Sequence, residues 1–384
     1  MASKELTPLL ASRDKPEMSP GKLGRDGCLA LLLPNQKTLE ISVANCSPPS
    51  SPVAPFSAAL QRPGPGGSQD GAGAVSRRQL PQAIAHRGYK MAYPENSMAA
   101  FRSAVEIGAH AIETDLHLSR DGVVVLSHDG TLKRCFDEDL RVAECDWSYL
   151  STLRTTRKPH EPMPRLVDLL EYLAQPGQEH VWVLLDIKKD DEPTDLISRV
   201  AATFASVPTK GDWHERVIMG CWDAKYAKLC NEILPDFPLA HIGWSLSYAR
   251  ELLAVPQMNF NLFVYSLVGA HGTKFLQAAR DAGRSVFVWT VNDDEWMKWS
   301  IRKGVDGVIT DNPERFLQIC KEWPDDEDEK AAERRQMRHF FSLRRPKPLL
   351  FLLLFRVLAT SVALVWFLRA GTPRQRVQNA LRGH

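Results

Sequence analysis

The sequence predicts an α/β fold in which eight parallel strands close into a barrel. Short apolar runs alternate with helix-like segments through most of residues 83–323, which is the pattern of a parallel sheet. Eight such runs remain when one short return strand is set aside, and eight strands close a (β/α)8 barrel of about 250 residues. Since no glycine-rich nucleotide-binding turn follows any run, an open doubly wound sheet is the weaker alternative.

The predicted strands are spaced so that one helix can follow each of them. The strands cover residues 83–87, 111–116, 181–188, 217–222, 239–243, 262–266, 286–291 and 306–311. Apolar residues at helical spacing predict helices at 97–108, 163–174, 195–207, 224–234, 247–255, 273–283, 295–304 and 313–323. The alternation of strand and helix is therefore complete from the first strand to the last.

One additional run, VVVLSHD at 123–129, follows the second strand after only a few residues around Ser119 to Gly122. A parallel return needs a crossover of about a dozen residues or more. The run must therefore turn back antiparallel, as a hairpin that forms a small insertion after the second strand.

Composition divides the rest of the chain. We interpret residues 1–80 as a disordered leader, because 28 of them are Pro, Gly or Ser and Phe56 is the only aromatic residue. Such a stretch buries too little apolar surface to offset the entropy lost on ordering. The further predicted regions are the barrel domain at 81–323, an acidic and then basic linker at 324–348, an apolar segment at 349–368 and a basic tail at 369–384.

The apolar segment LLFLLLFRVLATSVALVWFL at 349–368 is about one bilayer span long as a helix. Arg356 costs about 2.5–3.5 kcal/mol at mid-membrane on insertion scales, which its Leu and Phe neighbours more than offset. Both flanks are basic, so they give no orientation. A transmembrane helix and a monotopic insertion, in which Arg356 reaches the headgroups, both remain open. A buried core helix is disfavoured because the segment has no polar face.

Charge and cysteine content indicate the surroundings of the protein. Residues 333–384 hold 11 Lys or Arg and one acid, whereas residues 1–332 hold 37 basic and 45 acidic residues. We expect this tail to meet a membrane, and no nucleic acid partner. Seven scattered cysteines without a CxxC pair, and an N-terminus without an apolar signal region, favour a reducing compartment. We expect an intracellular membrane surface (endoplasmic reticulum, mitochondrion or lipid droplet), with the barrel in the cytosol.

Acidic residues stand where a barrel has its active site, at the carboxyl ends of the strands. Glu113 and Asp115 are two apart on a strand and share one face, and Asp186 ends the next parallel strand. Neighbouring carboxylates repel one another unless a proton or a cation lies between them. Oxygen ligands suit a hard ion, so we predict one divalent cation, Mg²⁺ or Ca²⁺.

Other strand ends carry groups suited to phosphate chemistry. His86 and His128 have the intrinsic pKa of a general base and a general acid near neutral pH. Arg87 and Lys188 add the positive charge that binds a phosphate group, although Arg87 could instead pair with one of the acids. The late strands end near Trp289, Asn292 and Asp311, and Trp289 could equally be packing or contact with the substrate.

These residues, in this order, resemble the glycerophosphodiester phosphodiesterase family. The stretch AHRGYKMAYPENSMAAFRSAVEIGAHAIETDLHLSRDGVVVLSHDGTLKR contains HRG, PEN, AF, GA, an E-x-D pair, DG and HD in register, and LLDIK, VWTVN and GVDGVITDNP match later signatures. The resemblance covers residues 83–323. It implies a TIM barrel with a small insertion after the second strand.

The resemblance also implies a role for each site residue. It makes His86 and His128 the catalytic acid and base, and Glu113 and Asp115 ligands of a divalent metal. Arg87 and Lys188 are similar to phosphate-binding residues. The family's third metal ligand is usually Glu, whereas this sequence has Asp186, one methylene shorter.

A further similarity, in IETDL, LLDIK, VWTVN and the apolar C-terminal segment, is to a fungal membrane-attached branch that includes a phosphatidylglycerol-specific phospholipase C. It implies a metal-dependent phosphodiesterase that cleaves phosphatidylglycerol to diacylglycerol and glycerol phosphate, held to the bilayer through 349–368. Glycerophosphodiesterase or lysophospholipase D activity is the alternative. A non-catalytic lipid-binding protein is less favoured, because both histidines and the acid pair are intact.

Overall fold

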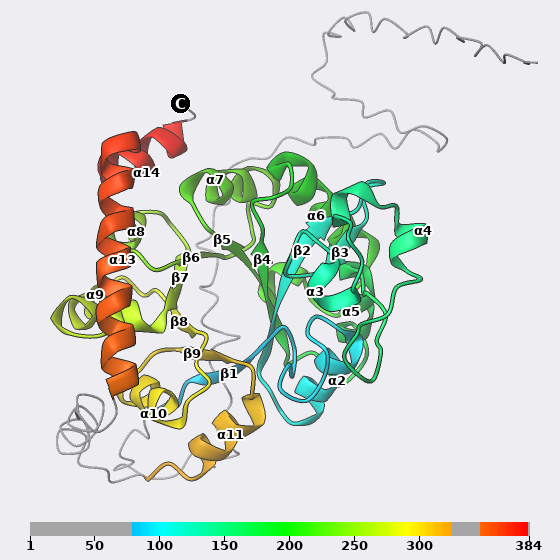
Figure 1. Cartoon of the computed structure of the whole chain (residues 1–384), viewed down its shortest axis with the longest axis horizontal. Coiled ribbons are helices and arrows are strands. Elements are labelled where there is room, and N and C mark those ends of the chain that lie inside the picture. Colours follow the sequence, from blue (N-terminus) through cyan, green and yellow to red (C-terminus); the bar gives the residue numbers. More distant parts are fainter. Residues whose placement is uncertain (1–78, 325–345, 383–384) are drawn as a thin grey trace, which may run out of the picture. The chain divides into compact units, whose positions relative to one another are not determined.

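The computed structural model describes residues 79–324 and 346–382. It confirms a barrel of eight parallel strands, with the short β3 added antiparallel to β2 (Figure 1). The order along the sheet is β1-β9-β8-β7-β6-β5-β4-β2-β3, and pairing of β1 with β2 closes the barrel. The strands are β1 Gln82–His86, β2 Ala111–Leu118, β3 Val124–Leu126, β4 Trp182–Ile187, β5 Val217–Cys221, β6 Leu239–Gly243, β7 Met258–Phe263, β8 Val286–Trp289 and β9 Gly307–Thr310.

Helices follow the parallel strands as predicted. They are α2 Met98–Glu106, α5 Leu166–Leu173, α6 Pro193–Ser206, α7 Ala224–Ile233, α8 Leu246–Leu252, α9 Ala270–Asp281, α10 Asp294–Lys303 and α11 Pro313–Lys321. Capping side chains fix several starts: Ser97 Oγ, for example, accepts the N–H of Ala100 at the start of α2. The predicted hairpin leads into the insertion, which holds α3 Lys133–Phe136, η1 Val142–Glu144 and α4 Trp147–Leu150.

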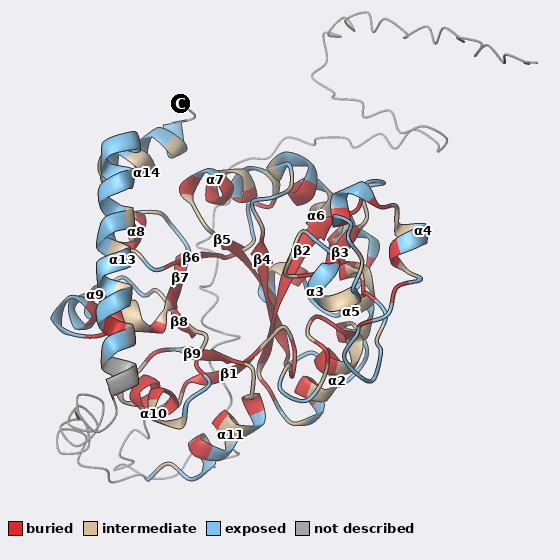
Figure 2. Cartoon of the chain, in the orientation of Figure 1, coloured by how far each residue is buried: buried red, intermediate tan, exposed pale blue. Residues whose placement is uncertain are grey.

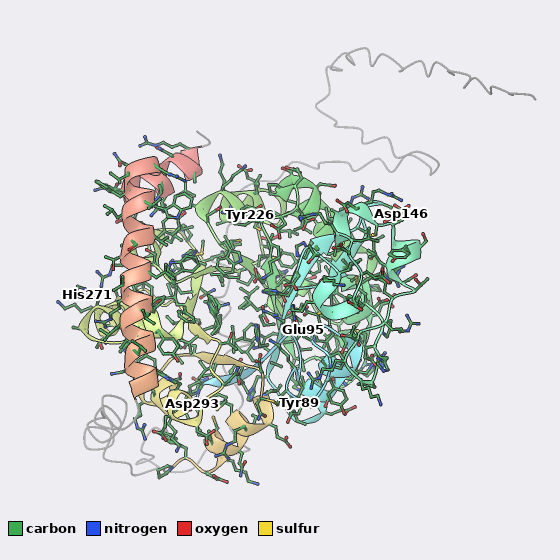
Figure 3. The ribbon with its side chains drawn as sticks, in the orientation of Figure 1. Tyr89, Glu95, Asp146, Tyr226, His271 and Asp293 are labelled. Carbon is green, nitrogen blue, oxygen red and sulfur yellow. The ribbon has the colours of Figure 1, made fainter. Side chains whose placement is uncertain are left out.

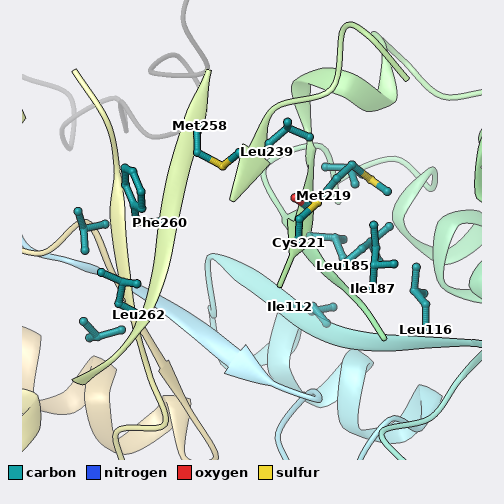
Figure 4. Close-up of a cluster of buried hydrophobic side chains, with 14 of the residues drawn as sticks. Ile112, Leu116, Leu185, Ile187, Met219, Cys221, Leu239, Met258, Phe260 and Leu262 are labelled. Atoms are coloured by element: carbon teal, nitrogen blue, oxygen red, sulfur yellow. Dashed lines mark hydrogen bonds between the residues drawn. The ribbon is translucent and has the colours of Figure 1, made fainter. Parts of the chain in front are cut away.

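Successive side chains along each strand point to opposite faces of the sheet, which gives the barrel two separate apolar cores. The outer core lies between the sheet and the helices and includes Ile112, Leu185 and Met219 (Figure 4). The inner core is a small plug within the barrel, made by Ile84, Ala111, Trp182, Leu184, Ile218, Ala240, Phe287 and Ile309. All of these plug residues lie within the first three positions of their strands. The plug therefore leaves the carboxyl ends of the strands to polar residues.

The strand predicted at 262–266 was wrong in position. The strand β7 covers Met258–Phe263, and Val264–Leu267 form the short helix η3. Buried Asn259 and Asn261 interrupt the apolar pattern, whereas LFVYS has the composition of a strand. The Asn259 side chain donates to the carbonyl of Leu239 (3.2 Å) and accepts the N–H of Ser285 (3.0 Å), so neighbouring backbone satisfies a polar residue inside the barrel.

Two helices follow the barrel near the C-terminus. The predicted apolar segment lies within α13, Pro346–Ala370, and the basic tail contains α14, Pro373–Arg382. Residues Leu352–Ala370 are long and apolar enough to cross a membrane, and α13 is exposed over most of its described length (Figure 2). The predicted leader up to residue 78 and the linker from 325 to 345 lie outside the described residues.

Candidate active site

Strand register brings the predicted catalytic and metal-binding residues together. His86 of β1 pairs with Glu113 of β2, and Asp115 of β2 pairs with Asp186 of β4. Partners in neighbouring parallel strands point to the same face of the sheet, as do residues two apart on one strand. These four side chains therefore continue the inner face of the barrel and lie beyond the apolar plug at the carboxyl ends of the strands.

The predicted metal ligands Glu113, Asp115 and Asp186 form a buried group. One carboxylate oxygen from each lies within 4.8 Å of the other two. Burial, together with the charges of Asp115 and Asp186, raises the pKa of Glu113 well above its ordinary value. Burial also raises the pKa of Asp186. At Asp115 burial acts in the same direction, but Lys188 and Arg87 outweigh it and lower the pKa of that carboxyl.

Two cations contact this acidic group. Lys188 Nζ lies 2.7 Å from Asp115 Oδ1 and 2.6 Å from Asp186 Oδ2. Arg87 Nε lies 3.3 Å from Asp115 Oδ2. Burial alone would lower the pKa of the Lys188 ammonium, but the two aspartates raise it. Both predicted phosphate-binding residues are therefore charged and adjacent to the acids.

The donor set fits a hard divalent cation. In the described part of the chain, the Glu113 side chain accepts one hydrogen bond, from the backbone N–H of Arg87 (3.1 Å). Its Oε2 lies 4.0 Å from His86 Nε2. A buried carboxylate with so few partners is unfavourable when charged. Mg²⁺ or Ca²⁺ held by Glu113, Asp115 and Asp186 would neutralise it with the oxygen ligands that these ions prefer.

His86 is oriented by a residue at the other end of the barrel sequence. Its Nδ1 lies 2.5 Å from Asp311 Oδ1, just after β9, and Asp311 also accepts from Asn292 Nδ2 (2.8 Å). Burial lowers the pKa of His86, against the opposing effect of Asp311. Burial acts to raise the pKa of Asp311, but the hydrogen bond from His86 and nearby positive charge bring it to about 2. The sequence placed Asp311 at a strand end without giving it a role.

His128 belongs to a second network. Its Nδ1 lies 2.7 Å from Asp129 Oδ1, and Asp129 Oδ2 accepts from Arg134 Nε (2.6 Å). Arg134 also donates twice to Glu95 (2.8 and 2.7 Å), which in turn accepts from Arg87 (2.8 Å). Glu95, labelled in Figure 3, lies between β1 and α2. Burial lowers the pKa of His128. The insertion and the first strand are thus joined through Arg134 and Glu95, neither of which the sequence singled out.

The loop after β1 supplies another residue that sequence reasoning missed. Asn96, with φ 49°, donates from Nδ2 to Asp115 Oδ2 (2.9 Å) and accepts from Thr114 Oγ1 (2.8 Å). Gly88 has φ +79°, and a Cβ there would lie 2.7 Å from Ala100, so a side chain has no room. The quoted HRG and PEN patterns contained both residues, but only the fold shows what they contact.

Trp289 lies in an aromatic wall beside the acids. Its ring contacts Trp222 (centroids 6.0 Å apart) and Phe263 (5.2 Å), and its Nε1 donates to the carbonyl of Asn261 (3.1 Å). Trp222 Nε1 donates to Asp186 Oδ1 (2.8 Å). The wall therefore holds Asp186 in place, and contact of Trp289 with a substrate stays a prediction.

Known proteins are similar to this chain in sequence and in fold. A profile described as the "Glycerophosphoryl diester phosphodiesterase family" matches residues 86–315. A glycerophosphodiester phosphodiesterase of Caldanaerobacter subterraneus is 28% identical over 246 residues, covering 62% of this chain and 97% of that protein. Lysophospholipase D GDPD3 of Mus musculus is 25% identical over 278 residues, covering 60% and 78%.

Solved structures agree in fold. A phosphodiesterase of Oleispira antarctica, in complex with the product sn-glycerol-3-phosphate, has a TM-score of 0.56 at 20% identity and covers 63% of this chain and 97% of that one. A glycerophosphodiester phosphodiesterase of Thermotoga maritima has a TM-score of 0.52 at 26% identity, covering 62% and 98%. Because the family profile spans more than half of the chain, including the strand-end acids and histidines, the protein belongs to the glycerophosphoryl diester phosphodiesterase family and is a phosphoric diester hydrolase.

Proposed function

We propose that the protein is a metal-dependent phosphodiesterase acting on the glycerophosphodiester group of a membrane phospholipid. Phosphatidylglycerol is the first candidate, with diacylglycerol and glycerol phosphate as products. The observation that carries the proposal is the buried triad Glu113, Asp115 and Asp186, with two cations in contact and two histidines that each have a carboxylate partner. The exposed apolar helix α13 supports a substrate that resides in a membrane.

The charged groups would bind and orient the phosphodiester. Arg87 and Lys188 offer N–H donors to the non-bridging phosphate oxygens. When bound by the three acids, the divalent ion would supply Lewis-acid polarisation of the phosphate. Asp186 has a shorter side chain than the Glu usual in the family, but Lys188 and Trp222 hold its two oxygens. These two hydrogen bonds compensate for the shorter side chain, since the ligand oxygens still lie within 4.8 Å of one another.

The two histidines would move the protons. One histidine accepts the proton of a glycerol headgroup hydroxyl as that oxygen bonds to phosphorus. The other histidine donates a proton to the departing diacylglycerol oxygen, whose bond to phosphorus breaks. The products of this step are diacylglycerol and a cyclic glycerol phosphate, and water then opens the ring to give glycerol phosphate. The hydrogen bonds to Asp311 and Asp129 support this pairing, because each leaves the Nε2 of its histidine available.

This route requires a vicinal hydroxyl in the headgroup, which phosphatidylglycerol has and phosphatidylethanolamine lacks. Direct attack by an activated water is the rival mechanism. Rapid quenching of a reaction with labelled phosphatidylglycerol distinguishes the two. A transient cyclic glycerol phosphate is expected, and its complete absence would favour direct attack.

Lysophospholipase D activity is the second candidate, favoured by similarity to lysophospholipase D GDPD3 of mouse. The two activities break different P–O bonds, so their products differ. We expect full-length protein to release diacylglycerol from phosphatidylglycerol in a reaction that EDTA abolishes and that His128→Ala slows at least about 100-fold. Release of lysophosphatidic acid from lysophospholipid, without diacylglycerol, would support the second candidate. Unchanged turnover in His128→Ala would contradict both.

A membrane location accords with this substrate. We propose that the protein works at an intracellular membrane, with α13 as its anchor and the barrel in the cytosol. The basic residues of the C-terminal region would be attracted to anionic lipid, the class to which phosphatidylglycerol belongs.

A further inference from the structure

We infer that α13 lies in the plane of one membrane leaflet, along the mouth of the barrel, and does not cross the bilayer. This inference rests on the proposed function in one respect, that a membrane is the partner. The sequence leaves the two arrangements open, because a 25-residue helix of about 37 Å is long enough for either. The contacts made by its two ends distinguish them.

The first half of α13 is attached to the barrel. Leu352 is buried in the outer core, and the Phe355 ring contacts Phe263 at the end of β7 (centroids 5.1 Å apart). Arg356 donates to the carbonyl of Val268, which precedes α9 (3.1 Å). The one charge inside the apolar segment 349–368 therefore donates to a protein carbonyl at the barrel, which reduces the cost of an arginine near hydrocarbon.

The far end of α13 returns to the same barrel. The chain reverses at Gly371, φ +77°, and Thr372 Oγ1 accepts the N–H of Gln375 (3.2 Å) at the start of α14. Helix α14 packs against α7 and α8. Its Val377 is buried in the outer core, and Arg376 lies over the ring of Tyr248 (5.1 Å).

These two attachments are incompatible with a spanning helix. A transmembrane helix has its ends on opposite sides of about 30 Å of hydrocarbon, and one barrel cannot contact both. A helix that lies on the surface buries an apolar face in one leaflet and keeps both ends on the same side. The attachment of both ends to one barrel therefore favours the in-plane arrangement.

The remaining surface of α13 suits lipid. One stripe, Leu352, Phe355, Ala359 and Val362, is buried or half-buried at helical spacing. Outside this stripe, the large apolar residues of α13 whose side chains the structure describes are exposed: Leu350, Leu353, Leu354, Val357, Leu358, Leu364, Val365, Trp366, Phe367 and Leu368. Residues 346–382 contain no acid, and exposed Arg369, Arg374 and Arg382 supply positive charge for anionic headgroups.

Three barrel residues that α13 and α14 contact, Phe263, Val268 and Tyr248, lie on the mouth side of the barrel, at or after the end of β7 or in the first turn of α8. Phe263 ends β7, and Tyr248 accepts through its hydroxyl the N–H of Ala224, the first residue of α7 (3.1 Å). Ring contacts run from Phe355 through Phe263 and Trp289 to Trp222, where Lys188 Nζ lies 5.9 Å from the ring centroid. An in-plane α13 would thus place the acidic site beside the leaflet, with an aromatic path between them.

Protease protection tests the arrangement in the full chain. Protein carrying an epitope after His384 is bound to sealed vesicles of phosphatidylglycerol and phosphatidylcholine, and protease is added outside. The in-plane arrangement predicts that epitope and barrel are cleaved together. An epitope that is protected until detergent is added, while the barrel is cleaved, would overturn the inference in favour of a spanning helix.

Substitution of two exposed leucines by glutamate tests whether the exposed face of α13 binds the membrane. Leu354 and Leu358 are 60% and 64% exposed, so Leu354→Glu with Leu358→Glu should reduce flotation with these vesicles at least tenfold. Hydrolysis of a water-soluble glycerophosphodiester should be unchanged. The matched control, Ser198→Glu with Ala202→Glu, places two acids at the same spacing on exposed positions of α6 and should float like the parent. The inference would be overturned if the parent protein did not bind vesicles but formed dimers, and the Leu354/Leu358 variant did not. That result would indicate that a second copy of the chain covers the exposed face of α13.

If soluble substrate is not hydrolysed by any of these proteins while vesicle binding behaves as expected, the proposed activity fails and the membrane arrangement stands. The two proposals can therefore fail separately.

Discussion

His86 Nδ1 and Asp311 Oδ1 lie 2.5 Å apart although 225 residues separate them in sequence. The contact exists because β1 and β9, the first and the last strand in the sequence, pair side by side in the barrel. A carboxylate on Nδ1 fixes the tautomer and the orientation of the imidazole, so that Nε2 faces the site. Nε2 accordingly lies 4.0 Å from Glu113 Oε2. Asp311 is therefore a positioning residue for the proposed acid and base chemistry.

Replacing Asp311 should impair turnover more than binding. Asp311→Asn keeps the shape of the side chain but loses the charge that holds His86, and we expect kcat to fall about 10- to 100-fold with KM nearly unchanged. Steady-state kinetics on a soluble glycerophosphodiester give both values. The control Asp281→Asn removes an exposed carboxylate on α9 that, among the described residues, accepts a hydrogen bond from Gln277, and it should leave kcat unchanged. A positioning role for Asp311 would be contradicted if Asp311→Asn and Asp281→Asn changed kcat and KM by the same amounts.

The contribution of Glu113 to the free energy of unfolding should depend on whether metal is bound. Without metal, burial and the neighbouring aspartates raise its pKa, so its contribution to folding is full at low pH and is lost as pH rises through the raised pKa. Glu113→Gln should then be at least as stable as the parent in EDTA at pH 8.

With Mg²⁺ or Ca²⁺ the order should reverse. A ligand present at 100 times its Kd stabilises the folded parent by about 2.7 kcal/mol, and Glu113→Gln should lose most of this gain. Thermal unfolding of both proteins, with EDTA and with each ion, measures the crossover. An equal rise in Tm for both proteins would place the ion elsewhere.

The fold was predictable because strand and helix periodicity is local. The eight parallel strands and the hairpin followed from runs of residues that each carry their own pattern. The error at β7 arose where Asn259 and Asn261 face inward and the Asn259 side chain bonds to neighbouring backbone, since no local pattern reveals such partners. The segment 262–266 has the apolar composition of a strand, but its chain turns into η3 after Phe263.

The site was predictable to the extent that it follows from strand ends. The acids and His86 come together because of parallel register, which the barrel hypothesis already contains. The hydrogen-bond partners around the histidines do not follow from strand register. Arg134 reaches Glu95 across 39 residues, and Asn96 depends on a left-handed backbone conformation. Contacts of this kind require the folded loops, which the sequence pattern does not specify.

Glu95 should make stability depend on acid pH. Burial acts to raise its pKa, but Arg134 and Arg87 outweigh it and lower the pKa from 4.5 to about 2. Its stabilising contribution is therefore full above pH 4.5 and is lost as pH falls from there toward 2. A shift of this size corresponds to roughly 3 kcal/mol. The difference in unfolding free energy between the parent and Glu95→Gln should be largest near pH 6 and should shrink below pH 4.5.

Urea unfolding across that pH range provides the measurement. Glu171→Gln is the matched control, because Glu171 is an exposed residue of α5 and should change stability little at any pH. A pH-independent difference for Glu95→Gln would contradict the ion-pair explanation and indicate a purely steric effect.

The aromatic path predicts selectivity for lipid substrates. Phe355 of α13 contacts Phe263, which contacts Trp289 beside the acidic site. If acyl chains pass along these rings, Phe355→Ala should lower kcat/KM for phosphatidylglycerol about 10- to 100-fold, since burial of a phenyl ring contributes about 1.5–3 kcal/mol. Hydrolysis of glycerophosphoglycerol, which has the same headgroup and no acyl chain, should be unaffected. Phe367 lies on the same helix with its ring exposed and outside the path, so Phe367→Ala should change vesicle affinity without changing the ratio of the two activities once binding is saturated. The same loss with both substrates would mean that Phe355 supports the fold of the mouth and does not guide lipid.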